Sequence, residues 1–159
     1  MPRIFAIALS ALLLVAGLAS PASADITGFL ATSSTPDKHS GVGFAIGGGL
    51  AIIGFEFEYC RLPEDEVTAI PGLRTGMGNL LLQSPTKGFQ VYGTVGGGLF
   101  NESFRGTSTT SFGSNFGGGA KIPLVGPVRL RLDYRVYNLH GTPLYSTPKR
   151  FYAGVSVSF

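Results

Sequence analysis

Two glutamates two residues apart, Glu56 and Glu58, are the first candidates for chemistry in this 159-residue sequence. On an extended strand they would point to the same side about 7 Å apart, and carboxylate pairs at such separations act in glycosidases. A second segment, 128–138, alternates charged with apolar residues. Buried charges must be paired, so we favour an interior ion-pair network over a catalytic pair. Its predicted members are Glu56, Glu58, Arg129, Arg131, Asp133 and Arg135, with Lys121 as a further candidate.

Three glycine triplets, at 47–49, 96–98 and 117–119, raise the question of a phosphate-binding loop. Such a loop opens a helix whose backbone amides meet the phosphate, and none of these triplets precedes a helical pattern. In a narrow barrel, glycine leaves room for long side chains opposite it, such as Arg131 and Tyr92, and permits strong coiling of the sheet. We therefore predict a structural role for the triplets.

The two histidines, His39 and His140, lie in segments predicted to be loops. With nearby serines and with Asp37 or Asp133, they could form a Ser-His-Asp site at one rim of the protein. Solvated loop histidines are the simpler interpretation. The acidic run 64–66 could attract a divalent cation weakly, but in the absence of clustered Cys and His we expect a solvated loop, no metal site and no cofactor.

These residues must be positioned by strands, because strand side chains point to opposite faces in turn. The clearest case is 128–138, where Val128, Leu130 and Leu132 alternate with charges. The same criterion gives eight strands, at 26–32, 41–49, 51–60, 73–83, 89–100, 111–124, 128–138 and 150–159. An even number of this size closes a small barrel. The predicted fold is therefore all-β, an eight-stranded antiparallel up-and-down transmembrane β-barrel.

The connections between the predicted strands alternate in length. The tight ones lie around 49–50, 84–88 and 125–127, and the longer, polar ones at 33–40, 61–72, 101–110 and 139–149. Membrane barrels have short periplasmic turns and long outer loops, so we expect the long loops outside and both termini in the periplasm. Aromatic residues near predicted strand ends fit interfacial girdles. They are Phe89, Phe100, Phe112, Phe151 and Phe159.

The N-terminus has the pattern of a secretory signal peptide. Arg3 precedes an apolar run at 4–19, and small residues follow, with Ala22 and Ala24 at the positions that a signal peptidase reads. We predict cleavage after Ala24. The chain then divides into a signal peptide at 1–24 and one barrel domain at 25–159.

Composition excludes several classes of protein. Without Arg3 the formal net charge of +3 falls to +2, which is too weak to predict binding of nucleic acid. A hydrophobic content of 44 % argues against disorder. The single cysteine, Cys60, cannot form an internal disulfide and is expected to be a small packing residue.

The last predicted strand carries a more specific signal. Apolar residues at 151, 153, 155, 157 and 159 alternate with others, and the sequence ends on an aromatic residue. This pattern resembles the signal by which the barrel-assembly machinery recognises its clients. The resemblance implies an assembly role for Phe151, Val155, Val157 and Phe159.

Over nearly its whole mature length the sequence resembles the small eight-stranded outer-membrane family that includes the transmembrane domain of OmpA and the adhesin-like OmpX and Ail proteins. The segments that carry the resemblance are 54–59, 78–80 and 130–135. The sequence ends at Phe159, so the peptidoglycan-binding domain of full-length OmpA is not expected. A wall-anchoring role is therefore not carried over.

Eight strands enclose an interior that side chains fill, so a porin-like channel is not expected. We expect a non-enzymatic outer-membrane protein with a structural or adhesin-like role, whose long loops could bind an external protein or matrix ligand. Contact with outer-membrane lipid and lipopolysaccharide is expected at the outer rim, where the predicted basic residues are Lys38, Arg61, Arg105, Lys149 and Arg150. Two alternatives stay open, namely a lipid-modifying enzyme at the outer rim and a soluble periplasmic lipocalin-like carrier. The absence of Trp argues mildly against the carrier.

Overall fold

The computed structural model describes residues 23–35, 37–50, 52–86 and 88–159. Most of the predicted signal peptide, including Ala22, lies outside the described residues, whereas Ala24 lies in the first strand. The cleavage site therefore stays a prediction. The strands are β1 (Ser23–Ser33), β2 (His39–Leu50), β3 (Ile53–Leu62), β4 (Gly72–Gln83), β5 (Gln90–Phe104), β6 (Thr107–Val125), β7 (Val128–Leu139) and β8 (Lys149–Ser158).

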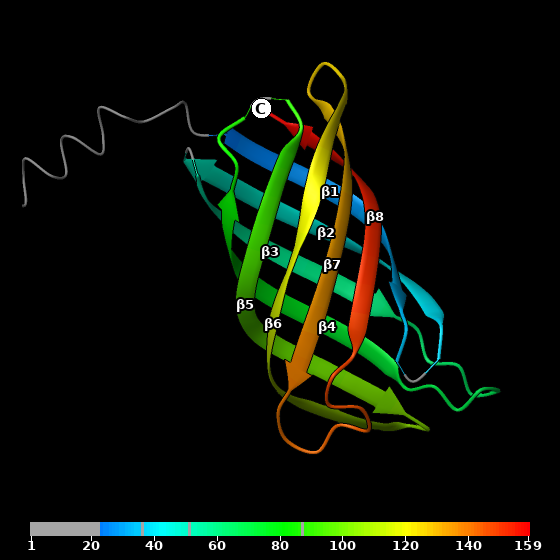
Figure 1. Cartoon of the computed structure of the whole chain (residues 1–159). Coiled ribbons are helices and arrows are strands. Elements are labelled where there is room, and N and C mark those ends of the chain that lie inside the picture. Colours follow the sequence, from blue (N-terminus) through cyan, green and yellow to red (C-terminus); the bar gives the residue numbers. More distant parts are fainter. Residues whose placement is uncertain (1–22, 36, 51, 87) are drawn as a thin grey trace, which may run out of the picture.

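The strands form one closed barrel. Each pairs antiparallel with its neighbour in sequence, and β8 pairs with β1 to complete the ring (Figure 1). The predicted all-β, eight-stranded antiparallel up-and-down barrel is confirmed. Among the described residues, no helix is long and apolar enough to cross a membrane.

Side chains alternate between the two faces of the barrel wall, and the hydrophobic ones point outward. On β3, Phe55 and Phe57 are 67 % and 52 % exposed, whereas Glu56 and Glu58 between and beside them are 5 % and 0 % exposed. The period of two that is visible in the sequence thus sorts apolar residues to the outside and charges to the inside. A water-soluble barrel has the opposite arrangement.

The two ends of the barrel differ. The turns β2–β3, β4–β5 and β6–β7 lie at the same end as the C-terminus, and we call it the turn end (Figure 1). The opposite end, called here the loop end, carries the connections 34–38, 63–71, 105–106 and 140–148. Short and long connections alternate as predicted, except at the third long connection.

That third connection, predicted as a loop at 101–110, is a hairpin. Strand pairing continues up to Phe104 and Thr107, and only Arg105 and Gly106 form the tip, both with positive φ. Threonines favour an extended chain, and Asn101 donates hydrogen bonds to hydroxyl groups across the hairpin. The prediction failed because hydroxyl-rich polarity was taken as a sign of a loop.

Phe100 is a second correction, because it does not belong to an outer aromatic girdle. Its side chain is 2 % exposed and packs inside the barrel with Leu62, Leu73 and Met77. Leu99 takes the outward position next to it. Alternation through the glycine triplet 96–98 therefore places Phe100 in the barrel interior. The other four aromatic residues are exposed as expected, namely Phe89, Phe112, Phe151 and Phe159.

Candidate functional site

Charged side chains fill the middle of the barrel. Three carboxylates and three guanidiniums, all buried, form what we call the interior ion-pair network. Its members are Glu56, Glu58, Asp133, Arg131, Arg135 and Arg150. Equal numbers of opposite charges allow this interior to exclude water, since each buried charge has a partner.

Two strands from opposite walls supply most of this network. Arg131, Asp133 and Arg135 project inward from β7, and Glu56 and Glu58 project from β3. In a closed ring of eight strands, β3 and β7 lie four strands apart and face each other across the lumen. The long arginine side chains therefore bridge the full cross-section of the barrel.

Asp133 is the point where several donors converge. It accepts hydrogen bonds from Arg131 and Arg135 at 3.0 Å and from the Tyr92 hydroxyl at 2.5 Å. Tyr92 in turn accepts a hydrogen bond from Arg131 Nε at 2.7 Å. Glu56 is paired with the same two arginines. Every charged member at this level is thus held by at least two partners.

A second level lies closer to the loop end. The hydroxyls of Tyr137 and Tyr152 donate to Glu58 Oε1 at 3.0 and 2.7 Å. Arg150 donates to the Thr75 hydroxyl and to Tyr137, both at 3.1 Å. Beyond this level the interior is apolar. It holds the cluster Leu62, Leu73, Met77, Phe100, Tyr137 and Leu139.

The structure corrects the predicted placement of one arginine and shows where another lies. Arg150, predicted at the outer rim, is 1 % exposed and lies inside the barrel, because Phe151 after it takes the outward position. Arg129, predicted within the network, lies toward the turn end, where it donates a long hydrogen bond of 3.4 Å to Gln90. Three residues of β7 separate Arg129 from Asp133, and the predicted inward direction of Arg129 agrees with its place in the lining of the cavity at the turn end.

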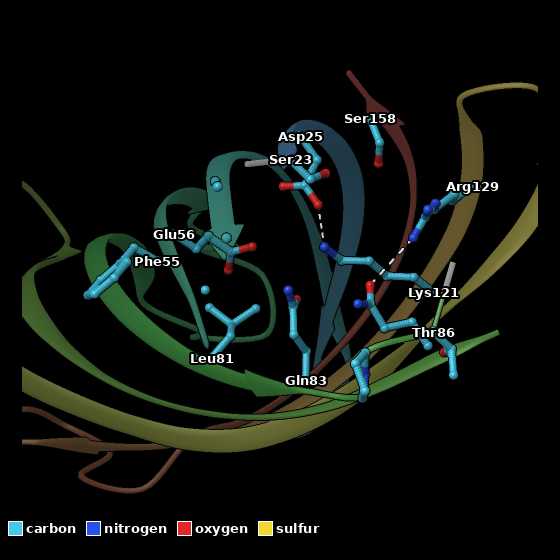
Figure 2. Close-up of a pocket in the computed structure, with 16 residues that line it drawn as sticks. Ser23, Asp25, Phe55, Glu56, Leu81, Gln83, Thr86, Lys121, Arg129 and Ser158 are labelled. Atoms are coloured by element: carbon cyan, nitrogen blue, oxygen red, sulfur yellow. Dashed lines mark hydrogen bonds and ion pairs between the residues drawn. The ribbon is translucent and has the colours of Figure 1, made fainter. Parts of the chain in front are cut away.

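At the turn end the barrel interior opens into a cavity of about 260 Å³. Lys121 reaches across this cavity to pair with Asp25, and Arg129 lines it (Figure 2). Glu56 forms its inner limit. Water from the turn end can therefore enter the barrel only as far as the interior ion-pair network, because that network fills the cross-section.

The pairing of Glu56 and Glu58 does not support catalysis. Both carboxylates contact guanidiniums, and a general acid needs a proton that such a contact disfavours. Neither histidine completes a Ser-His-Asp site, since among the described residues His39 bonds to the backbone oxygen of Asp37 and His140 lies against the ring of Phe112. The structure thus brings neither set of candidates into a catalytic arrangement.

The acidic run 64–66 forms a turn at the loop end. Asp65 pairs with Ile70, and its carboxylate accepts a hydrogen bond from the Val67 amide at 3.0 Å. Hydrogen bonds from the hydroxyl and amide of Thr68 lower the pKa of Asp65. Within the part of the chain that the structure describes, no group of three His, Cys, Asp or Glu side chains could hold a metal ion.

Acidic side chains also link the connections at the loop end. Glu64 accepts a hydrogen bond of 2.7 Å from the Arg105 amide, which joins the β3–β4 connection to the hairpin tip. Glu102 accepts one of 3.0 Å from the Leu144 amide, which joins the same hairpin to the β7–β8 connection. Sequence patterns gave no signal for these contacts, since they depend on which connections are neighbours in space.

The predicted assembly residues lie on the closing strand. Phe151, Val155 and Phe159 are exposed on the outward face, and Val157 is half-buried on the same face. Beyond the end of β8, the Phe159 backbone exchanges two hydrogen bonds with Ala24, at 2.9 and 3.1 Å. Their proposed recognition by the assembly machinery stays a prediction.

Several residues were not predicted from the sequence to lie in the interior. They are Asp25, Thr75, Tyr137, Arg150 and Tyr152. Alternation along the strands could have placed each of them on the inner face. Their partners could not be found in this way, because residues as distant as Asp25 and Lys121 meet only through the stagger of the closed ring.

No family model matches the sequence, and no curated protein is similar to it. Solved structures are similar in fold. Neisserial surface protein A has a TM-score of 0.58 and 15 % identity over 88 % of this chain and 97 % of that chain. The N-terminal barrel of Pseudomonas aeruginosa OprF has a TM-score of 0.65 and 15 % identity over 86 % and 97 %. Ail of Yersinia pestis, solved with the heparin analogue sucrose octasulfate, has 0.51 and 13 % over 87 % and 97 %.

These neighbours share the strand number and closure of the barrel described above, and each is matched over nearly its whole length. At 13 to 15 % identity, the likeness concerns the fold. The chain therefore has the fold of the small eight-stranded outer-membrane β-barrels.

Proposed function

We propose that this chain is an integral outer-membrane barrel without enzymatic activity, whose loop end forms a surface that binds an external partner. The observation that supports the membrane location is that the outer face of the barrel is apolar and the inner face is charged, which is the reverse of a water-soluble barrel. Outward positions hold apolar side chains that are about half exposed or more, such as Leu30, Phe55, Val95 and Phe116. Such an outer surface is stable in lipid and costly in water.

The closed interior supports a role for the loop end. The interior ion-pair network and the apolar cluster behind it fill the lumen, so a passage for solutes through the barrel has no structural basis. The residues free to meet another molecule are those of the connections. Because acidic side chains link three of these connections, the loop end has a defined shape.

The lengths of the connections support the orientation that we propose. In membrane barrels of this size the short turns face the periplasm. The loop end would then face the outside, and both ends of the barrel domain the periplasm. In this orientation the open cavity near Asp25 faces the periplasm (Figure 2).

Membrane location is tested by fractionation and gel migration. The full chain is expressed in a Gram-negative host, and detergent-extracted outer membranes are compared before and after boiling. A folded barrel is expected in the outer-membrane fraction as a band that migrates faster when unboiled. Recovery of an unshifted protein from the periplasm would contradict the proposal and favour a soluble carrier.

The binding role is tested by exchange of connections. Residues 140–148 and the hairpin 101–110 are replaced by short Gly-Ser or Asn-Gly turns, and adhesion of the cells to matrix proteins and to host cells is measured. We expect adhesion to fall while the heat-shifted band persists. The matched control shortens the turn 84–88 at the other end, which should leave adhesion unchanged. Equal adhesion for all variants would leave only a structural role in the envelope.

A further inference from the structure

The charges on the strands are divided between the two faces of the barrel. All acidic residues of the described strands occupy inward-facing positions, namely Asp25, Glu56, Glu58, Asp133 and, beyond the filled interior near the hairpin tip, Glu102. The charged residues at outward positions are all basic. They are Arg61, Arg74 and Lys149, and each lies within three residues of the loop end of its strand.

Arg61 and Arg74 form a direct cross-strand pair. The register of β3 and β4 places them opposite each other, and both side chains are exposed. Directly opposed residues have Cβ atoms about 5 Å apart, and like charges at this position destabilise a sheet. Among the described residues, neither guanidinium has a carboxylate or any other hydrogen-bond partner. In the described part of the chain the repulsion is therefore not compensated.

The pair lies at the level of a lipid headgroup. Two residues from Arg61 toward the middle of β3, the side chain of Tyr59 also points outward. Its ring centroid lies 5.8 Å from that of Phe44 on β2. Aromatic rings of this kind occupy the boundary between hydrocarbon and headgroups. The next outward position toward the loop end is Arg61, so in the proposed orientation its guanidinium would be beside the phosphate layer of the outer leaflet.

We propose that Arg61 and Arg74 together bind a phosphate group on the headgroup of an outer-leaflet lipid. A phosphate monoester carries between one and two negative charges at neutral pH and can accept hydrogen bonds from both planar guanidiniums. When the phosphate is bound, it lies between the two guanidiniums and its negative charge offsets their mutual repulsion. Asn101, opposite Arg74 on β5, extends the polar row beside the pair.

The site takes a lipid phosphate rather than free phosphate, because the apolar surface directly below it receives acyl chains. Phe57 on β3 is exposed there, with its ring next to the outward Gly76 of β4, and Leu80 is exposed further toward the turn end. This inference rests on the proposed membrane location and outward-facing loop end. A soluble phosphate would gain the charge contacts without this apolar surface.

The binding experiment uses the folded barrel in a maltoside detergent that lacks phosphate. Native mass spectrometry follows binding of diphosphoryl lipid A, of fully dephosphorylated lipid A and of inorganic phosphate. The double variant Arg61→Gln/Arg74→Gln is expected to bind diphosphoryl lipid A at least about tenfold more weakly, which corresponds to the loss of one or two charge-assisted hydrogen bonds. The matched control, Arg105→Gln/Lys149→Gln, removes the same charge from the same rim but at positions outside the Arg61–Arg74 pair, so it should weaken lipid A binding less than the Arg61→Gln/Arg74→Gln variant.

The outcomes separate the site from the membrane location. Equal loss in both double variants would mean a general charge effect and would overturn the site, as would binding of inorganic phosphate as tight as that of lipid A. A chain that never forms a heat-modifiable barrel would overturn the membrane location together with the site. A folded barrel with unchanged lipid A binding would overturn the site alone.

A second variant gives an effect of opposite sign. Arg61→Glu should raise the urea midpoint of unfolding in the phosphate-free detergent, because an ion pair with Arg74 replaces the repulsion. Lipid A should then raise the midpoint of the unmodified chain but not that of Arg61→Glu. The same increase for both proteins would show that lipid A acts elsewhere, which would contradict the proposal.

Discussion

Arg131 on β7 joins the opposite wall of the barrel through Glu56 on β3 and also pairs with Asp133 on its own strand, and the apolar cluster lies between these contacts and the loop end. Replacing a buried ion pair with apolar residues can be neutral, whereas removing one partner leaves a buried charge without compensation. The network is therefore sensitive to single substitutions even where its net contribution to stability is small.

Arg131→Ala tests this sensitivity. We expect the free energy of unfolding to fall by about 3–5 kcal/mol, because Glu56 and Asp133, both buried, lose a shared partner. Urea unfolding in detergent, followed by tyrosine fluorescence, measures the change. Lys149→Ala, at an exposed position, should change it by less than about 0.5 kcal/mol. A loss for Arg131→Ala no larger than that of the control would place Arg131 in solvent.

Gly119→Ala tests the structural role of the glycine triplets. A Cβ at this position would collide with the Leu132 carbonyl oxygen and lie 2.5 Å from the Tyr92 hydroxyl. Overpacking of this kind costs about 1–3 kcal/mol. Gly28→Ala is the matched control, because a Cβ there meets nothing within 4 Å. Equal unfolding midpoints for the two variants would show that Gly119 is not required for space.

For the interior residues, the sequence predicted that the side chains point inward better than it predicted their position along the barrel axis. Strand alternation correctly placed Glu56 and Arg131 in the barrel interior. The same rule places Arg150 there, but its charge was taken to indicate a position at the outer rim. Levels depend on the stagger between strands. That stagger is not encoded in any one strand, which is why the pairing of Lys121 with Asp25 was not predicted.

At the scale of elements, β5 and β6 extend furthest from the barrel and are the strands whose bounds were least well predicted. Their central glycine triplets interrupt the hydrophobic alternation from which the other strands were recognised. Their outer parts are polar because both faces meet water beyond the rim. A period of two in hydrophobicity exists only where one face meets an apolar medium, so sequence patterns locate the membrane part of a strand and miss its extension.

The end of β8 offers a prediction about assembly. Phe159 is exposed and its backbone closes the ring with Ala24. Phe159→Ala should reduce the amount of heat-shifted protein in outer membranes several-fold while refolding in detergent proceeds normally, because the backbone bonds are retained. Phe116→Ala, equally apolar and exposed on β6, is the control. Equal amounts of assembled protein for both variants would exclude a special role for Phe159.

The turn at Asp65 offers a prediction about pH. Hydrogen bonds lower the pKa of Asp65 in the folded state, so they stabilise the turn above the ordinary carboxyl pKa of about 3.9 and are lost as the pH falls through the lower folded value. Hydrogen exchange at the Thr68 amide should therefore show protection at neutral pH that declines on acidification. In Asp65→Asn this pH dependence should disappear. A variant that keeps it would assign the titration to another group.

For the whole molecule, the closed and filled lumen predicts low permeability. Vesicles that contain the barrel should admit small sugars no faster than empty vesicles, since the network spans from β3 to β7. Liposome swelling measures this, with vesicles containing a large porin as positive control. Swelling close to the porin rate would show that the interior side chains open a passage.

The overall fold could be predicted because closure needs only an even number of strands with one apolar face and alternating connections. The eight strands and their antiparallel order followed from alternation in segments such as 128–138. The contacts at the loop end could not be predicted, because Glu64 and Glu102 bind amides of connections that are adjacent only in the closed ring.

The backbones of Ala24 and Phe159 are hydrogen-bonded to each other, so the two ends of the barrel domain lie side by side in the closed sheet. A linker of a few residues could join Phe159 to Ala24, and new chain ends could be opened within the connection 140–148 without breaking any of the ladders between strands. Such a circular permutant would carry its N- and C-termini on the loop end. Fused reporter domains would then be displayed beside the loops, whereas the natural order of the chain directs fusions to the turn end.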